Sequence, residues 1–373
     1  MSWLTITTHA QAPDPELPDV DLSTSLAGLA LPNPVLTASG CAAAGRELHQ
    51  FVDVATLGAV TTKSVMLDPR SGRATPRMAE TPSGMLNSIG LQGPGIDAFC
   101  AEDLPWLVEH RARTVVSIAG GSVDEYAELA KRLGDTDGVD AVEVNISCPN
   151  VESRGQVFAC HPEPAAAVVA AVRRGLPPDV PVLAKLSPDV TDIVAIARAC
   201  VDAGADGLSM INTLLGMAVD TVTDRPALAG VTGGLSGPAV RPVAVRCLWQ
   251  VHAAMPEVPL VGMGGVRTGR DVLEMVLAGA SAVALGTILF HDPGAPARVL
   301  GELHQALAAR GETRLSNLVG RAHSTSARTA DPTTDSDQVT ETDQTQGSGR
   351  TTAGAPDTDS DSATDPAARE SPP

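Results

Sequence analysis

The stretch Ala141-Val142-Glu143-Val144-Asn145-Ile146-Ser147-Cys148-Pro149-Asn150 decides how the rest of the chain is interpreted. Residues 141–146 are mostly apolar and follow the alternation of a β-strand. Pro149 cannot donate a hydrogen bond to a β-ladder, so the strand has to end before it. The end of the run carries two amides, a hydroxyl and a thiol. The stretch therefore predicts a buried strand whose exit brings Cys148 to a loop that a ligand can approach.

Seven other short apolar runs have the same character, and helical patterns lie between most of them. The runs are Pro34–Ala38, Gly58–Thr62, Thr114–Ile118, Pro181–Leu186, Gly207–Ile211, Pro259–Met263 and Ala282–Leu285. Strands that alternate with helices predict parallel βαβ units. Eight such units over about 280 residues match a (β/α)8 TIM barrel in size, and a doubly wound open α/β sheet is the alternative. Residues 20–31 predict a hairpin before the barrel.

Composition sets the limits of the predicted domain. Only 2% of the residues are aromatic, so an aliphatic core has to fill the barrel, as parallel strands buried on both faces require. From Asp331 onward the chain carries about −8 of its net charge of −18 and few large apolar residues. We therefore predict a flexible arm at 1–17, the barrel at 18–318 and a disordered acidic tail at 319–373. The acidity also argues against nucleic-acid binding.

The cysteines and the hydrophobic runs bound the cellular context. None of the six cysteines forms a Cys-x-x-Cys pair, so neither a zinc site nor an iron–sulfur cluster is expected. No apolar run approaches the roughly 20 residues that span a bilayer, and residues 1–17 contain no signal-peptide core. The sequence predicts a cytoplasmic protein with reduced thiols, no metal and no contact with a membrane.

Polar residues recur where the apolar runs end, and in a barrel all these ends meet at one mouth. They are Ser39-Gly40, Lys63-Ser64, Ser117, Asn145 with Cys148, Lys185, Asn212-Thr213, Gly264-Gly265 and Gly286-Thr287. The glycine turns on the last two strands favour a phosphate bound by backbone N–H groups. Only three of the 26 basic residues are lysine, and two of these end apolar runs. The coincidence of eight exits favours a ligand site over ordinary turns.

Cys148 and Lys185 are the candidates for chemistry, and each has a structural alternative. A thiol titrates near about 8.5, so Cys148 could act as a base or nucleophile with help from its surroundings. A small buried hydrophobe is the alternative. Lys185 could stabilise negative charge on a bound ring, or it could form a structural ion pair.

These motifs resemble the class 1 dihydroorotate dehydrogenases, most closely the class 1B catalytic subunit. The resemblance covers about residues 20–309 and rests on Thr37-Ala38-Ser39-Gly40, Thr61-Thr62-Lys63-Ser64, Asn87-Ser88-Ile89-Gly90-Leu91-Gln92, Asn145-Ile146-Ser147-Cys148-Pro149-Asn150, Lys185-Leu186-Ser187-Pro188, Ile211-Asn212-Thr213, Gly233-Gly234-Leu235-Ser236-Gly237-Pro238 and the two glycine turns. It implies an FMN enzyme that oxidises (S)-dihydroorotate to orotate in pyrimidine (UMP) biosynthesis.

The resemblance also implies roles for individual residues. Cys148 would take the C5 proton while hydride passes from C6 to flavin N5, and Lys63 would bridge flavin and substrate. Substrate contacts would come from Lys63, Asn87, Ser88, Ile89, Gly90, Leu91, Asn145, Asn212 and Thr213. FMN contacts would come from Ser39, Lys63, Ser64, Ser117, Asn145, Lys185, Ile211, Gly237, Gly264, Gly265, Gly286 and Thr287.

Three departures from the family pattern concern the ring and the electron acceptor. Ser117 replaces a usual Asn, Gly93 replaces a frequent Asn, and residues 151–156 lack the glycine pair common in class 1B. Class 1B implies a partner subunit with FAD and a [2Fe–2S] cluster that passes electrons to NAD, in a homodimer or heterotetramer. The alternatives are a flavin dihydropyrimidine dehydrogenase, a fumarate-dependent class 1A enzyme and a non-catalytic flavin-binding barrel.

Overall fold

The computed structural model describes residues 19–146 and 161–326, and its centre is one eight-stranded parallel sheet. The strands are β3 (Val35–Thr37), β4 (Val60–Thr61), β7 (Thr114–Ile118), β8 (Ala141–Asn145), β9 (Val182–Leu186), β10 (Gly207–Met210), β15 (Leu260–Met263) and β16 (Ala282–Leu285). Each lies in a run predicted from the sequence. Their order is β3-β16-β15-β10-β9-β8-β7-β4, and a bridge from Leu36 to Ala59 joins the two ends. The sheet therefore curls into a barrel, and the predicted (β/α)8 fold is confirmed.

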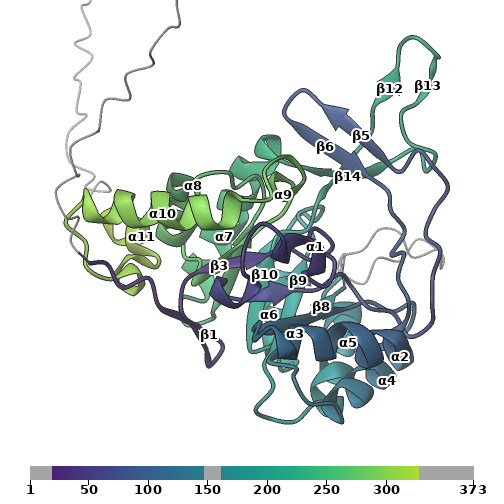
Figure 1. The fold of residues 1–373 in the computed structure, drawn as a ribbon, viewed down its shortest axis with the longest axis horizontal. Coiled ribbons are helices and arrows are strands. Elements are labelled where there is room, and N and C mark those ends of the chain that lie inside the picture. The colour runs from purple at the N-terminus through teal and green to yellow at the C-terminus, as the bar shows by residue number, and fades with distance from the viewer. Residues whose placement is uncertain (1–18, 147–160, 327–373) are drawn as a thin grey trace, which may run out of the picture. The chain divides into compact units, whose positions relative to one another are not determined.

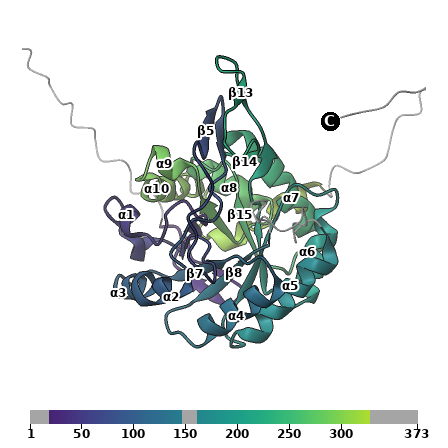
Figure 2. The ribbon, with the colours of Figure 1, turned by 90° about the vertical axis from the view of Figure 1, so that its right-hand side faces the viewer.

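Helices surround the strands, as the view in Figure 2 shows. The long ones are α4 (Val123–Gly134), α5 (Pro162–Gly175), α6 (Ile193–Asp202), α7 (Arg241–Ala254), α8 (Gly269–Leu277) and α10 (Ala295–Ala308). Side-chain caps start three of them. The hydroxyl of Ser122 accepts a hydrogen bond from the Glu125 N–H, and the carboxylate of Asp192 accepts two from the first turn of α6. Thr268 forms a reciprocal capping box at α8.

Two helix-to-strand joints, at residues 203–206 and 278–281, have the same geometry. Gly204 and Gly279 have φ of +102° and +123°, a region that favours glycine. In each joint the residue after the glycine donates its N–H to a carbonyl five residues earlier in the chain. Ala205 donates to the Cys200 carbonyl and Ala280 to the Met275 carbonyl, both at 3.0 Å. This is the Schellman arrangement. The same hydrogen-bonded turn therefore ends α6 before β10 and α8 before β16.

The predicted hairpin closes the other end of the barrel. Its strands are β1 (Thr24–Leu26) and β2 (Leu29–Leu31), and their last residues, Leu26 and Leu31, are buried against the lower barrel interior. The Thr24 hydroxyl donates a 2.9 Å hydrogen bond to the Ser281 carbonyl. The lower end of the barrel is therefore an apolar core, and the other end is left for ligands.

Two long loops at the upper end form a second sheet that the sequence analysis did not foresee. Its order is β11 (Leu214–Gly216), β14 (Gly233–Ser236), β6 (Gly84–Asn87) and β5 (Met78–Thr81), all antiparallel. The small hairpin of β12 (Val219–Asp220) and β13 (Arg225–Pro226) stands beyond it (Figures 1 and 2). Pairing of β14 with β6 places Gly234 opposite Asn87. Loops that follow different barrel strands thus hold one another over the mouth.

Short helices complete the described chain: α1 (Arg46–His49), α2 (Ile96–Ala98), α3 (Leu104–Glu109), α9 (Ile288–His291) and α11 (Arg321–Ser326). The ring of His323 on α11 stacks on Trp249 of α7, with 3.7 Å between centroids. The folded unit therefore continues through residue 326, past the domain boundary predicted at 318. Residues 1–17 and 327–373 of the predicted arm and tail lie outside the described residues. Among the helices described, none is long and apolar enough to cross a membrane.

Candidate active site

A cavity of about 590 Å³ lies at the carboxyl ends of the barrel strands. This volume is within the usual range for a cofactor or substrate site. Most residues predicted for ligand binding line it: Ser39, Lys63, Ser64, Asn87, Ile89, Gly90, Leu91, Asn145, Lys185, Ile211, Asn212, Thr213, Gly237, Gly264, Gly265, Gly286 and Thr287. Side chains far apart in sequence therefore meet in one space because they end neighbouring strands.

Three predicted residues are not part of the described cavity wall. Cys148 lies outside the described residues, within 147–160. Ser88 is buried behind the wall, where its hydroxyl is 3.4 Å from an Arg73 nitrogen. Ser117 has no exposed surface and lies beneath the floor. Its hydroxyl has protein partners, and its contact with FMN stays a prediction.

The floor of the cavity contains a buried ion pair between Lys185 and Glu143. The Lys185 Nζ atom lies 3.5 Å from Glu143 Oε1, and the two side chains are only 5% and 2% exposed. Asn145 on β8 pairs with Lys185 on β9, and Glu143 lies two residues before Asn145, on the same inward face. The ion-pair alternative for Lys185 is thus observed, and Lys185 still lines the cavity. Both functions are compatible with its position.

Glu143 is a site residue that the sequence analysis missed. The signal was present, because Glu143 is the one acid in the otherwise uncharged strand Ala141–Asn145. A carboxylate in a fully buried strand needs a partner to offset its desolvation. Lys185 on the neighbouring strand β9 is that partner, and the order of the strands in the barrel brings the two together.

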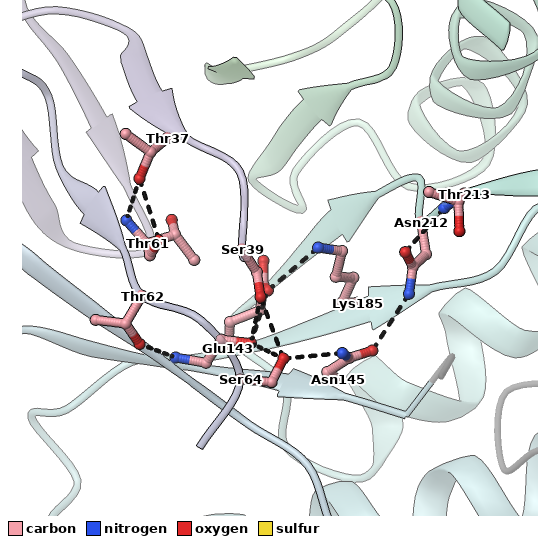
Figure 3. Close-up of polar contacts among 11 residues, drawn as sticks. Thr37, Ser39, Thr61, Thr62, Ser64, Glu143, Asn145, Lys185, Asn212 and Thr213 are labelled. Carbon is pink, nitrogen blue, oxygen red and sulfur yellow. Dashed lines mark hydrogen bonds and ion pairs between the residues drawn. The ribbon is translucent and has the colours of Figure 1, made fainter. Parts of the chain in front are cut away.

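Three serine hydroxyls from different strand exits connect this ion pair to the amides above it (Figure 3). Ser117 donates to Glu143 Oε1 at 3.1 Å, and Ser64 and Ser39 lie 2.9 and 3.1 Å from the Ser117 hydroxyl. The side-chain nitrogen of Asn145 donates to Ser64 at 3.0 Å. The floor is therefore a continuous hydrogen-bonded network rather than a set of independent polar residues.

Side-chain amides form the next level of the site. Asn212 donates to the Asn145 side-chain oxygen at 3.3 Å, and its own oxygen accepts the Thr213 N–H at 2.8 Å. Asn87 donates to the Gly234 carbonyl at 3.3 Å from the second sheet. These contacts hold three amides at the wall, where they can present donors and acceptors to a planar polar ring.

Glycines make room for a ligand at the other side of the cavity. Gly264 and Gly265 have φ of +131° and +71°. A Cβ on Gly265 would lie 2.6 Å from the Gly237 carbonyl oxygen, and one on Gly264 would lie 2.9 Å from Ala244 Cβ. The Thr287 hydroxyl donates to Ser236 at 2.8 Å and ties the last strand exit to the second sheet. Both turns line the cavity, and a side chain at either Gly264 or Gly265 would collide with neighbouring protein atoms, so these positions require glycine.

Cys41 contributes a thiol to the cavity wall, and its electrostatics argue against a role as base. Burial raises its pKa to about 11, although the charges of Lys185 and Lys63 act in the opposite direction. The thiol is therefore neutral near pH 7 and cannot accept a proton there.

A cavity walled by strand-exit side chains is where (β/α)8 enzymes carry out their chemistry, so the fold and the site together define a barrel enzyme. The chain belongs to the dihydroorotate dehydrogenase family, since that family's model matches residues 21–307.

Individual relatives cover most of the chain. A "Dihydroorotate dehydrogenase B (NAD(+)), catalytic subunit" from Desulforudis audaxviator is 52% identical over 306 residues, which is 82% of this chain and 99% of the relative. Proteins of the same name from Pelobacter propionicus and Geobacillus kaustophilus are 51% and 48% identical. The Pelobacter match covers 80% of this chain and 98% of that relative, and the Geobacillus match covers 82% of this chain and 97% of that relative. The resemblance noted in the sequence is confirmed, class 1B included.

Proposed function

We propose that this chain binds FMN and oxidises (S)-dihydroorotate to orotate, with Cys148 as the general base, and that it passes the electrons to NAD through a second subunit. One observation carries the proposal: in a member of this family, Lys63, Lys185, the side-chain amides and the glycine turns line a single cavity at the barrel mouth. The printed names of the relatives, NAD-linked catalytic subunits, support the acceptor and the partner.

The cavity fits FMN at both of its ends. Gly264 and Gly265 line the cavity wall, where their backbone N–H groups are candidates to bind the phosphate. At the opposite side, Lys185 lines the cavity beside the amides of Asn145 and Asn212. A flavin ring needs hydrogen-bond donors along its polar edge and a positive charge that favours its reduced form. The lysine and the amides supply both kinds of group.

The roles of the chain's own residues follow from this placement. When bound, FMN would accept hydride from C6 of the substrate. Lys63 lines the cavity, and its Nζ atom lies near Gly40, so it can hold a carboxylate or ring oxygen of the substrate. Asn87, Asn145 and Asn212 orient the substrate ring. Cys148, three residues after β8 in the sequence, removes the C5 proton in this proposal.

Anaerobic titration of the purified protein with dihydroorotate tests the reaction. We expect a yellow protein whose flavin absorbance is bleached at about one equivalent of substrate, and reoxidation by NAD only when an electron-transfer subunit with FAD and a [2Fe–2S] cluster is added. Fumarate, quinone and uracil-type dihydropyrimidines serve as comparison acceptors and donors. Bleaching by another dihydropyrimidine but not by dihydroorotate would contradict the proposal.

Replacement of the proposed base gives the sharpest test of the chemistry. The Cys148→Ala variant should retain FMN but reduce it more slowly by about 10²-fold or more, because a general base is lost. Stopped-flow absorbance under anaerobic conditions measures this rate. Cys41→Ala is the matched control, since its thiol is neutral near pH 7, and it should reduce FMN at close to the normal rate. Normal reduction by Cys148→Ala would remove Cys148 from the mechanism.

A further inference from the structure

Glu143 lies just below the cavity, in a position from which it can influence every polar group on the floor. It is 2% exposed and contacts Lys185 directly, while the described residues that line the cavity include neither Asp nor Glu. It therefore places a negative charge in direct contact with a cationic side chain of the cavity wall. Because it lies behind the wall, any influence on the reaction has to pass through its neighbours.

The hydrogen-bond directions show how far this influence extends. A serine hydroxyl has one proton, and Ser117 uses it to donate to Glu143. Ser117 therefore accepts from Ser39 and from Ser64, and Ser64 in turn accepts from the Asn145 amide nitrogen. All these protons point toward one carboxylate. With its nitrogen on Ser64, Asn145 has to direct its oxygen to Asn212, as the structure shows (Figure 3).

We propose that Glu143 is a positioning residue that offsets the charge of Lys185 beside the flavin and fixes the amide orientation of Asn145 through Ser117 and Ser64. The proposal rests on the proposed function, because it assumes that FMN and dihydroorotate bind above this floor. Its two arms make separable predictions. The charge acts on the reduction potential of bound FMN, and the hydroxyl chain acts on the substrate.

The charge arm is tested by Glu143→Gln, which keeps the shape and an acceptor oxygen but removes the negative charge. The Lys185 charge then stands without its offset, so the reduced flavin anion is favoured. We expect the reduction equilibrium of bound FMN to shift at least tenfold toward the reduced form, which for two electrons is a rise of about 30 mV. Spectroelectrochemical titration measures the midpoint. An unchanged or lower potential would overturn this arm.

The hydroxyl arm is tested by Ser117→Ala, which breaks the chain and leaves the ion pair intact. We expect KM for dihydroorotate to rise about tenfold, as an oriented amide is lost, with the flavin potential close to that of the wild type. Ser209→Ala is the matched control. Its hydroxyl is also inward-facing and buried, on β10 beside Lys185, yet it contacts no hydrogen-bond partner within the described residues. An equal rise in KM for dihydroorotate in Ser117→Ala and Ser209→Ala would overturn this arm.

A third measurement does not require the cofactor. Urea unfolding of FMN-free wild type, Glu143→Gln, Lys185→Met and the double variant forms a double-mutant cycle. We expect coupling of at least tenfold in the folding equilibrium constant, since either single change leaves a buried group unpaired. If Glu143→Gln does not fold, Glu143→Met, which also removes the negative charge, replaces it in the cycle and in the potential measurement. If the effects of the two single changes on the free energy of unfolding simply add, the pairing of Glu143 with Lys185 would be overturned.

These results separate the two proposals. A wild-type protein that shows the coupling but neither retains FMN nor oxidises dihydroorotate would contradict the proposed function and leave the ion pair standing. A wild-type protein that oxidises dihydroorotate, combined with no coupling and no shift in potential, would contradict the role of Glu143 alone.

Discussion

The lower and upper halves of the barrel interior are lined by inward-facing residues of the same strands, but these residues are apolar in the lower half and polar in the upper half. On β8 the inward positions change from Ala141 to Glu143 and Asn145, and on β9 they change from Leu183 to Lys185. β7 changes from Val115 to Ser117. All of these residues are buried. Burial alone therefore does not tell the core from the site, whereas the position along the strand does.

The comparison shows how one set of strands supports both stability and chemistry. The lower residues are packed against the β1–β2 hairpin and lose surface to water, which stabilises the fold. The upper residues are held at the ends of rigid strands and bind one another, so their desolvation is offset by hydrogen bonds and charge. Changes in the two halves should accordingly affect different measurements.

The largest expected effect comes from the lower half. Leu36 is 1% exposed and packs with Ala59 and Ala284 inside the barrel. Leu36→Ala should lower the free energy of unfolding by about 2–5 kcal/mol, because it removes buried methyl groups and leaves a cavity. Urea unfolding followed by circular dichroism measures this change.

The turnover rate of the same Leu36→Ala variant tests whether the change in the lower half leaves the cavity unaffected. With stoichiometric FMN bound, Leu36→Ala should keep kcat within about twofold of the wild type, since Leu36 belongs to the apolar cluster of the β1–β2 hairpin and does not itself line the cavity. A loss of kcat much larger than the loss of folded protein would show that the two halves are not separable.

The repeating parts of the fold were predictable from sequence because their signals are local. Short aliphatic runs identified all eight barrel strands, and Gly204 and Gly279 marked two helix ends whose geometry proved to be the same. The Gly264-Gly265 pair after β15 marked a turn for a similar reason, since both residues have positive φ. A positive φ is a local requirement that glycine meets at least cost.

Features that depend on contacts between distant segments were not predictable in this way. Glu143 gains its partner only when β8 lies beside β9, and the second sheet forms only when residues 84–87 meet residues 233–236. The partners of Ser117, which include Glu143 on β8, likewise become neighbours only when β7 and β8 pair. In each case the deciding fact is which segment becomes a neighbour in space.

An intermediate effect is expected at the glycine cradle in the upper half. Gly265→Ala requires φ of +71°, which costs about 1–2 kcal/mol for a residue with a Cβ, and that Cβ would meet the Gly237 carbonyl. We expect FMN affinity to fall about tenfold or more, which is 1.4 kcal/mol, as measured by fluorescence titration of the FMN-free protein.

A glycine in a helix provides the control for this change. Gly301 lies within α10, and a Cβ there would meet nothing within 4 Å. Gly301→Ala should leave FMN affinity unchanged and raise the free energy of unfolding by about 0.5–1 kcal/mol, because alanine loses less entropy in a helix. Equal losses of FMN affinity in both variants would indicate a general effect and not a cradle.

The smallest effect is expected at Ser209, which sharpens the boundary between the two halves. Ser209 faces the barrel interior at the level of Lys185, as a member of the upper half should, but its buried hydroxyl has no hydrogen-bond partner in the described part of the chain. Such a group costs free energy without contributing to the network. Ser209→Ala should therefore raise the free energy of unfolding by up to about 1 kcal/mol and leave FMN affinity and potential unchanged. Calorimetry and the same flavin titrations measure both. A fall in FMN affinity would instead show that Ser209 belongs to the FMN site.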